Sequence, residues 1–391
     1  MTKPPLSGLK VVELARILAG PWIGQTLADL GADVVKVEAK EGDDTRRWGP
    51  PDVEGADGTR SAAYFHACNR GKRAMVADFR DAGDLALVRR LIGAADVVVE
   101  NFKVGGLARY GLDYASLSAD NPGLVYCSIT GFGQTGPYAA RAGYDFLIQG
   151  MSGIMDLTGD PAGGPQKIGV AFADIFTGLY GTIAIQAALL ERARTGLGQQ
   201  IDMALLDCMG GVLANQAMNY LVTGRAPTRL GNVHPNIAPY QTFEAEDGPM
   251  IVACGNDLQF ARLCAVLGLP ALAAEARFAT NPARVAHRAA LEEALGPAIA
   301  ARTRADLSQA LETAGVPAGP INSVADLFAD PQFRHRGMEI AADGVPGVRT
   351  PIVFSRTPLS EPARAPDLGE HDTDLRRGIA TRGWPRREEA G

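Results

Sequence analysis

Short runs of β-branched residues alternate with helical stretches along the first half of the chain. Four runs rich in valine or isoleucine predict strands, and a shorter run adds a fifth: Leu9–Leu14, Asp33–Val37, Ala74–Ala77, Asp96–Val99 and Gly123–Ile129. Helical patterns lie between them, one ending at Leu30 and another spanning Asp84–Gly93. Strands that alternate with helices are typical of a parallel, doubly wound sheet. The pattern therefore predicts an α/β fold with a Rossmann-like large domain.

The second half of the chain changes character after one more helix–strand–helix sequence. We expect a helix over Asp174–Arg194, a strand over Gln200–Met203 and a long helix to Val222, followed by a linker rich in glycine, proline and asparagine. Beyond it, one strand and three helices predict a smaller α+β domain: Gly248–Cys254, Gln259–Leu267, Arg284–Ala301 and Arg304–Ala314. The proline-rich tail is expected to return to the first domain. The predicted division is 1–222, 223–328 and 329–391.

Composition and charge narrow the class of protein. With 391 residues, 46% of them hydrophobic and 21% charged, the chain can form more than one globular domain. The net charge of −6 gives no basic field for nucleic acid or an anionic membrane. The apolar run Ile175–Leu190 is interrupted by small and polar residues and is short for a membrane span, and the N-terminus lacks the apolar core of a signal peptide. We expect a cytoplasmic protein that binds neither nucleic acid nor membrane.

Cysteine and histidine suggest no metal site. The five cysteines are widely scattered, and their odd number does not suit a disulfide framework. The five histidines show no ligand spacing either, and only His234 lies in a loop rich in glycine and asparagine. We predict no bound metal.

The segment Gly131–Gly136, GFGQTG, has the glycine spacing of a dinucleotide-binding turn. Such a turn should open a helix directly after the first strand of its sheet. Here Pro137 and Tyr138 follow instead, and the motif comes after the fifth predicted strand. We therefore expect no nicotinamide or flavin.

Asp174 is the only charged residue between Lys167 and Glu191. Two roles suit a lone carboxylate at the start of an apolar helix. It can cap the helix by accepting hydrogen bonds from free N–H groups. It can also be a poorly hydrated carboxylate, kept ionised by the helix N-terminus, that attacks an activated acyl group. The two roles are compatible.

Basic residues in the first half lie near the ends of predicted strands, where open α/β sheets bind ligands. They are Lys40, Arg46, Arg47, Lys72, Arg73, Arg80, Lys103 and Arg109. Scattered surface charge accounts for many of them, but a ligand with several phosphates, such as coenzyme A, requires such a set.

Ten or more segments, in order over residues 6 to 355, resemble the class III CoA-transferases, which include formyl-CoA and carnitine CoA-transferases. They include LSGLKVVEL, LADLGADVVKVE, NRGKRAMVADFR, ADVVVENFKVGGLARYGLDY, GFGQTGPY, GYDFLIQGMSG, ADIFTGLYG, GQQIDMALLD, GNVHPNIAPYQTF and GVPAGPINS. Each segment is weak alone, but their order and spacing together are specific.

This resemblance implies an interlocked homodimer whose large domain combines N- and C-terminal parts. It also implies that Asp174 attacks a donor acyl-CoA, forms a mixed anhydride and then carries CoA as an aspartyl thioester. Coenzyme A thioesters would be substrates, and no permanently bound cofactor is required.

The resemblance assigns further residues to the site. Coenzyme A would contact Ile17, Leu18, Ala19, Lys40, Ala77, Arg80, Asn101, Phe102, Lys103, Arg109 and Tyr144. Lys40 is included because Ala39 stands where some members have arginine. The acids would contact Arg16, Asp145, His234 and Asn236, with Arg229 as a further cation.

Other activities of the same superfamily remain as alternatives. The α-methylacyl-CoA racemases have histidine where this chain has Tyr144, and tyrosine is a poorer base near neutrality. Transfer is therefore favoured over racemisation. The presence of Asp174 in its matching context argues against a non-catalytic role. The loop GNVHPNIAPY resembles that of members that use succinyl-CoA and dicarboxylates such as glutarate, mesaconate, malate or hydroxymethylglutarate. A carnitine-type transferase is the second choice.

Overall fold

A computed structural model describes residues 2–55 and 58–385 of the chain. Its internal contacts divide the chain into two compact units. The first unit holds the residues up to 154, residues 167–225 and the residues from 332 on. The second holds residues 155–166 and 226–331.

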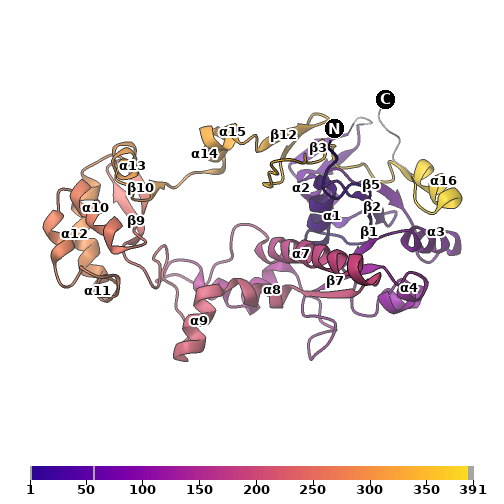
Figure 1. Ribbon diagram of the computed structural model, residues 1–391, viewed down its shortest axis with the longest axis horizontal. Helices are drawn as coiled ribbons and strands as arrows, with labels where there is room; N and C mark the ends of the chain where they lie inside the picture. Colours follow the sequence, from indigo (N-terminus) through magenta and orange to yellow (C-terminus); the bar gives the residue numbers. More distant parts are fainter. Residues whose placement is uncertain (1, 56–57, 386–391) are drawn as a thin grey trace. The chain divides into compact units, whose positions relative to one another are not determined.

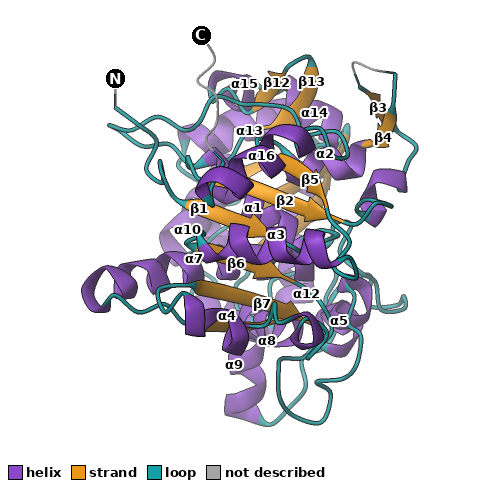
Figure 2. Cartoon of the chain, turned by 90° about the vertical axis from the view of Figure 1, so that its right-hand side faces the viewer, coloured by secondary structure: helices purple, strands orange, loops and turns teal. Residues whose placement is uncertain are grey.

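The first unit is built on a six-stranded parallel sheet with the order β5-β2-β1-β6-β7-β8. Figure 2 labels β5, β2, β1, β6 and β7 of this sheet. These strands are β1 (Lys10–Glu13), β2 (Asp33–Glu38), β5 (Arg73–Val76), β6 (Val97–Glu100), β7 (Val125–Thr130) and β8 (Gln200–Ala204). Counted along the chain, the order is 3-2-1-4-5-6, which is the order of dinucleotide-binding folds. The predicted α/β class and parallel sheet are confirmed.

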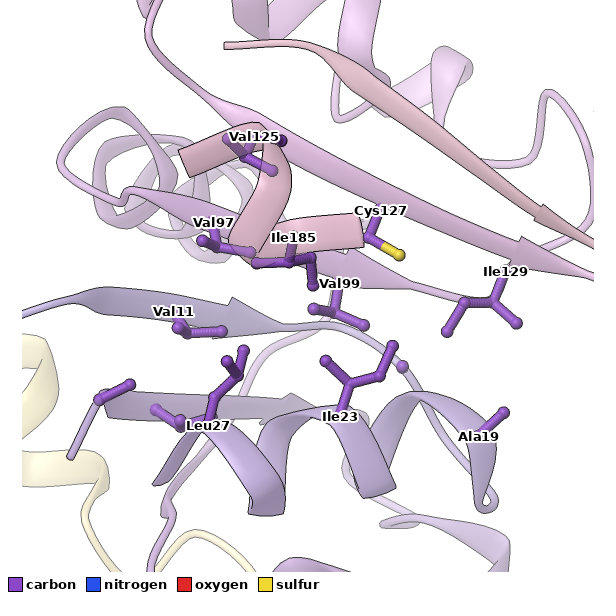
Figure 3. Packing of buried hydrophobic residues seen from close by; sticks show 14 of the residues in the cluster. Val11, Ala19, Ile23, Leu27, Val97, Val99, Val125, Cys127, Ile129 and Ile185 are labelled. Carbon is purple, nitrogen blue, oxygen red and sulfur yellow. The ribbon is translucent and has the colours of Figure 1, made fainter. Parts of the chain in front are cut away.

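Both faces of this sheet are covered by helices, because alternate strand residues point in opposite directions. Val11 and Val99 pack against Ile23 and Leu27 of α1 (Ala19–Asp29), as Figure 3 shows, together with residues of α7 (Phe172–Thr195). The opposite face packs against α3 (Ala82–Gly93), α4 (Tyr114–Asp120) and α16 (Asp372–Arg382). The sheet is therefore the middle of three layers.

Shorter elements complete the first unit. Two hairpins are formed by β3 (Asp52–Glu54) with β4 (Arg60–Ala62) and by β12 (Glu339–Ala342) with β13 (Val345–Val348). The other helices of this unit are η1 (Asp44–Arg47), α2 (Ala63–Asn69), η2 (Ala108–Tyr110), α5 (Asp145–Met151), α8 (Leu205–Val212) and α9 (Ala214–Thr223). Two short helices, α6 (Ile154–Leu157) and α15 (Pro331–His335), lie where the chain passes from one unit to the other.

One helix of this unit was predicted to be continuous, and that prediction is wrong. The stretch to Val222 is not a single helix but the pair α8 and α9, because Ala214 has a φ of 44° that an α-helix does not allow. Hydrophobic spacing continues across the break, so the pattern gave no sign of it.

Helix α7 is longer than the apolar run from which it was predicted. It has 24 residues, which by length and composition alone would suffice to cross a membrane. Its buried residues, including Ile185 and Ala188, belong to the core between the sheet and α1. The apolar run Ile175–Leu190 lies within this longer helix, whose packing is that of a core helix.

The C-terminal segment adds to the outer edge of the sheet, at strand β5. His371 accepts a hydrogen bond from the Ala74 N–H through Nδ1 and donates its own N–H to the Ala74 carbonyl. Asp372 accepts from the Val76 N–H, and Arg376 donates to the Val76 carbonyl. The tail thereby occupies backbone groups of an edge strand that would otherwise be open to another chain.

The second unit is a three-stranded antiparallel sheet with helices on it. The strands are β9 (Tyr240–Ala245), β10 (Gly248–Ala253) and β11 (Ala318–Pro320), and the helices are α10 (Asp257–Val266), η3 (Pro270–Ala274), α11 (Asn281–Ala286), α12 (Arg288–Ala300), α13 (Arg304–Thr313) and α14 (Val324–Ala329). The predicted helix Arg284–Ala301 is two helices that break at His287. Figure 1 shows the strands and helices of each unit.

A buried arginine organises this second core. The side chain of Arg284 is fully buried, donates to the carbonyls of Ala238 and Phe278, and pairs with Asp257 at 2.7 Å. Its guanidinium also lies 4.5 Å from the ring centre of Phe260. A buried cation is stable here because each of its three nitrogens donates to an acceptor.

Candidate active site

A cavity of about 410 Å³ lies at the carboxyl ends of β1, β6 and β7. In an open parallel sheet the connections after neighbouring strands 1 and 4 leave in opposite directions, which opens a crevice between them. Strands β1 and β6 are that pair here. The lining is Arg16–Ala19, Asn101–Val104, Gly106, Arg109, Ile129–Gly131, Ala139–Tyr144, Asp174 and Leu205.

Asp174 reaches this cavity from the first turn of α7. The residue is 9% exposed, and burial raises the pKa of its carboxyl to about 7, with a further contribution from the charge of Asp145. The positive end of the helix dipole acts in the opposite direction, because it favours the anion. Near neutrality the group therefore exists in both protonation states.

One of the two interpretations of the sequence was that Asp174 caps its own helix. The structure shows that it does not. Asp145, at the start of α5, supplies that contact: its Oδ1 accepts from the Ala173 N–H at 2.7 Å and from the Asp174 N–H at 3.3 Å. Gln149 holds the other oxygen of Asp145 at 2.7 Å. Capping by a separate carboxylate leaves the Asp174 side chain available to the cavity.

The loops after β1 and β6 are tied together at the cavity. The Arg16 N–H donates to the Asn101 side-chain oxygen at 2.9 Å, and the Asn101 amide donates to the Arg16 carbonyl at 2.7 Å. Phe102 is anchored by its N–H, which donates to Glu100 at 2.7 Å. Burial raises the pKa of Glu100 to about 7.

Four basic side chains line the same cavity: Arg16, Lys103, Arg109 and Arg141. Arg16 pairs with Asp44 at 3.2 Å, with both side chains substantially exposed. Arg141 lies 4.4 Å from the ring centre of Tyr138, and Arg109 lies 4.6 Å from that of Tyr110. Such a set matches the phosphates of coenzyme A.

The structure thus brings together most of the predicted coenzyme A residues and Asp174. Ile17, Leu18, Ala19, Asn101, Phe102, Lys103, Arg109 and Tyr144 line one cavity, as does Arg16. Tyr144 is 64% exposed there, and Asp145 lies behind the cavity as the cap of α7.

Three predicted coenzyme A residues do not line this cavity. Lys40 is exposed and lies 3.9 Å from Glu41, Ala77 is buried, and Arg80 pairs with Asp78 at 2.8 Å. The two predicted acid-binding residues of the GNVHPNIAPY loop lie in the second unit. There the ring of His234 packs at a tilt of 56° against Tyr240, and its Nδ1 accepts from the Asn236 N–H at 3.1 Å.

Arg229 also lies in the second unit, where its guanidinium is engaged by that unit. It pairs with Asp156 at 3.1 Å and donates to the carbonyls of Asp156, Asp160 and Gly163. These contacts make it a structural residue.

Sequence analysis missed the segment 139–143, Thr130, Gly131 and Leu205. The GFGQTG motif contained the signal in its first glycine. A Cβ at Gly131 would lie 2.6 Å from the Cα of Gly143, so two glycines allow the end of β7 to approach the start of α5. This approach places Tyr144 and Asp145 beside the cavity.

No cluster of three metal-ligating side chains occurs within residues 2–55 and 58–385. The cavity itself is lined by one buried carboxylate, Asp174, and by four basic side chains.

Comparison with known proteins connects this geometry to a family. The model of CoA-transferase family III matches residues 6–372. A succinate–glutarate CoA-transferase of Agrobacterium fabrum is 60% identical over 380 residues, covering 95% of each chain. The human succinyl-CoA:glutarate CoA-transferase is 40% identical over 95% of this chain and 85% of its own.

The fold has a solved counterpart as well. The crystal structure of a CAIB/BAIF family protein from Brucella suis superimposes with a TM-score of 0.86 and 66% sequence identity. The match covers 96% of this chain and 99% of that chain.

Proposed function

The chain belongs to CoA-transferase family III, and from that premise we propose that it moves coenzyme A from succinyl-CoA to a short dicarboxylate, with Asp174 carrying the CoA between the two acids. The observation that carries the proposal is the position of Asp174. It is a buried carboxylate at the end of a cavity whose other walls supply four cations.

The first half-reaction uses the Asp174 carboxylate as nucleophile. One of its oxygens attacks the thioester carbonyl of the donor, the C–S bond breaks, and CoA leaves as a thiolate with a mixed anhydride remaining. The thiolate then attacks the aspartyl carbonyl, the anhydride C–O bond breaks, and succinate leaves. The product is an aspartyl-CoA thioester at position 174.

The second half-reaction reverses these steps with the acceptor. The acceptor carboxylate attacks the aspartyl carbonyl and releases the CoA thiolate. The thiolate attacks the acceptor carbonyl of the new anhydride, and Asp174 leaves as a carboxylate. Burial protects both acyl intermediates, because bulk water would hydrolyse them.

The residues of the cavity have separate roles in this scheme. Ile17–Ala19 and Asn101–Lys103 hold coenzyme A, with Lys103, Arg109 and Arg141 near its phosphates. Asp145 fixes the first turn of α7, and so orients Asp174. Arg16 is proposed for the remote carboxylate of the acids. The acid-binding roles of His234 and Asn236, which lie in the second unit, stay predictions.

Glutarate is the first acceptor to assay, because relatives at 60% and 40% identity are named for glutarate. Racemisation stays a less favoured alternative, because Tyr144, which lines the cavity, stands where the racemases have histidine. A carnitine-type acceptor stays the second choice.

We also propose a cytoplasmic homodimer. Large apolar side chains remain exposed along one side of α7 and on α9, among them Ile183, Leu190, Leu221 and Val222, each more than 60% exposed. A second copy of the chain would bury them.

The covalent step is tested by trapping. Enzyme incubated with succinyl-CoA and reduced with borohydride should carry an alcohol in place of the carboxyl at position 174, located by peptide mass spectrometry. The Asp174→Asn protein, in which the side chain keeps its size, should show no alcohol at position 174 and no transfer of coenzyme A. Turnover with glutarate while Asp174 stays unmodified would refute the scheme.

A further inference from the structure

The wall of the cavity between β1 and α1 contains a strained backbone. Ile17 has a φ of 74°, in the left-handed region. A β-branched residue rarely adopts this conformation, because its side chain collides with its own backbone, and it persists only where the surroundings impose it. Ile17 lines the cavity, so whatever imposes its conformation also shapes the site.

Asp43 supplies the contact to the Ile17 N–H. Its two carboxylate oxygens lie 3.3 and 3.2 Å from that nitrogen. The carboxylate is fully buried and is itself fixed by Thr45, whose N–H and hydroxyl donate to it at 3.1 and 2.8 Å. Asp43 does not line the cavity.

A buried lysine holds Asp43 in place and charged. The Nζ of Lys36 lies 3.0 Å from Asp43 and 3.0 Å from Glu13, and it donates to the Ala15 carbonyl at 2.8 Å. Burial acts to raise the pKa of Asp43, but Lys36 and the hydrogen bonds of Asp43 together lower it below its usual value. The carboxylate is therefore anionic at neutral pH.

Other side chains engage the remaining backbone of this wall. Lys72 pairs with Glu13 at 2.7 Å and donates to the Pro21 carbonyl at 2.9 Å. The thiol of Cys68 donates to the Ile17 carbonyl at 3.6 Å, and burial raises the pKa of that thiol to about 12, so that it stays protonated. The wall is thus held by side chains from several elements.

We propose that Asp43, held by Lys36, is a positioning residue that imposes the left-handed conformation of Ile17 and thereby shapes the wall against which coenzyme A binds. This inference rests on the proposed function for its ligand. Asp43 acts through Ile17 and makes no contact with coenzyme A.

A double-mutant cycle with free coenzyme A as the probe tests this role, with affinity measured by isothermal titration calorimetry. Glycine adopts a positive φ at no steric cost. Asp43→Ala should therefore weaken binding about tenfold in the wild-type background, an effect of ~1.4 kcal/mol. In the Ile17→Gly background the same substitution should cost less than about threefold.

Asp33→Asn is the matched control. Asp33 is at the other end of strand β2 from the cavity and pairs with Arg73 in a partly buried ion pair. The Asp33→Asn substitution should lower the melting temperature and leave the coenzyme A affinity unchanged. If Asp43→Ala does not fold, Asp43→Asn replaces it, with the same dependence on the background expected.

The outcomes separate the two proposals. A wild-type protein that does not bind coenzyme A overturns the proposed function and this inference with it. Binding by the wild type, combined with an equal loss in both backgrounds or with no loss at all, overturns only the positioning role of Asp43.

Discussion

Two carboxylates at the N-terminus of α7 have the two roles, helix cap and carboxylate at the cavity, that the sequence suggested for one residue. Asp145 accepts hydrogen bonds from N–H groups of the first turn, while the Asp174 carboxyl lines the cavity with a pKa raised to about 7. The isolation of Asp174 in an apolar run made it visible in the sequence. The role of Asp145 was not visible, because its hydrogen bonds join residues 28 and 29 positions apart and depend on the packing of α5 against α7.

The raised pKa makes transfer sensitive to pH in the physiological range. Because the carboxylate and not the acid attacks the thioester, kcat/KM for succinyl-CoA should rise as pH increases through about 7 and level off above it. Asp145→Asn keeps an acceptor oxygen but removes a negative neighbour. It should shift the acid limb down by roughly 0.5–1 pH unit.

Initial rates between pH 5 and 9 measure this shift. Asp374→Asn, which alters a surface ion pair with Arg377, is the control and should leave the profile in place. An unchanged acid limb in Asp145→Asn would show that the Asp145 charge does not act on the nucleophile.

At the scale of elements, the close approach of β7 and α5 depends on two glycines. Gly131→Ala would place a Cβ 2.6 Å from the backbone of Gly143, so the two segments must separate. Overpacking of this kind costs about 1–3 kcal/mol. We expect a melting temperature lower by several degrees and a reduced kcat/KM, because Tyr144 and Asp145 move with α5.

Thermal unfolding and transfer kinetics of the same preparation check this. Gly93→Ala at the end of α3, where a Cβ meets no atom within 4 Å, is the matched control and should leave both quantities close to the wild type. A Gly131→Ala protein with wild-type stability and kinetics would contradict the account.

Strands and helices with strong periodicity were predicted from the sequence to within a few residues. The breaks inside helical stretches were not. Ala214 interrupts one predicted helix with a positive φ, and His287 interrupts another, although neither residue is a strong helix breaker. The burial of Arg284, whose acceptors lie on other segments, likewise has no local signal.

At the scale of the whole molecule, the exposed apolar side chains of α7 and α9 require a cover. We expect a dimer by analytical ultracentrifugation at micromolar concentration. Leu221→Glu on α9 should shift the sedimentation coefficient toward that of the monomer, because a buried unpaired charge opposes association. Leu258→Glu, on an exposed position of α10 in the second unit, is the comparison and should remain dimeric.

A Leu221→Glu protein that sediments like the wild type would exclude α9 from the interface, and a monomeric wild type would refute the dimer itself.

The sequence indicated a tail that returns to the large domain, but not where it docks. That required the contacts of His371, Asp372 and Arg376 with the backbone of β5, which no local pattern encodes. The order of the chain therefore matters when the protein is synthesised. Val76 leaves the ribosome 296 residues before Asp372, so at 5–20 residues per second the edge strand waits roughly 15–60 seconds for its own cover. During that interval something other than the C-terminal segment must keep the edge strand of a nascent chain from pairing with neighbouring chains. Strand β5 is therefore made early and covered late.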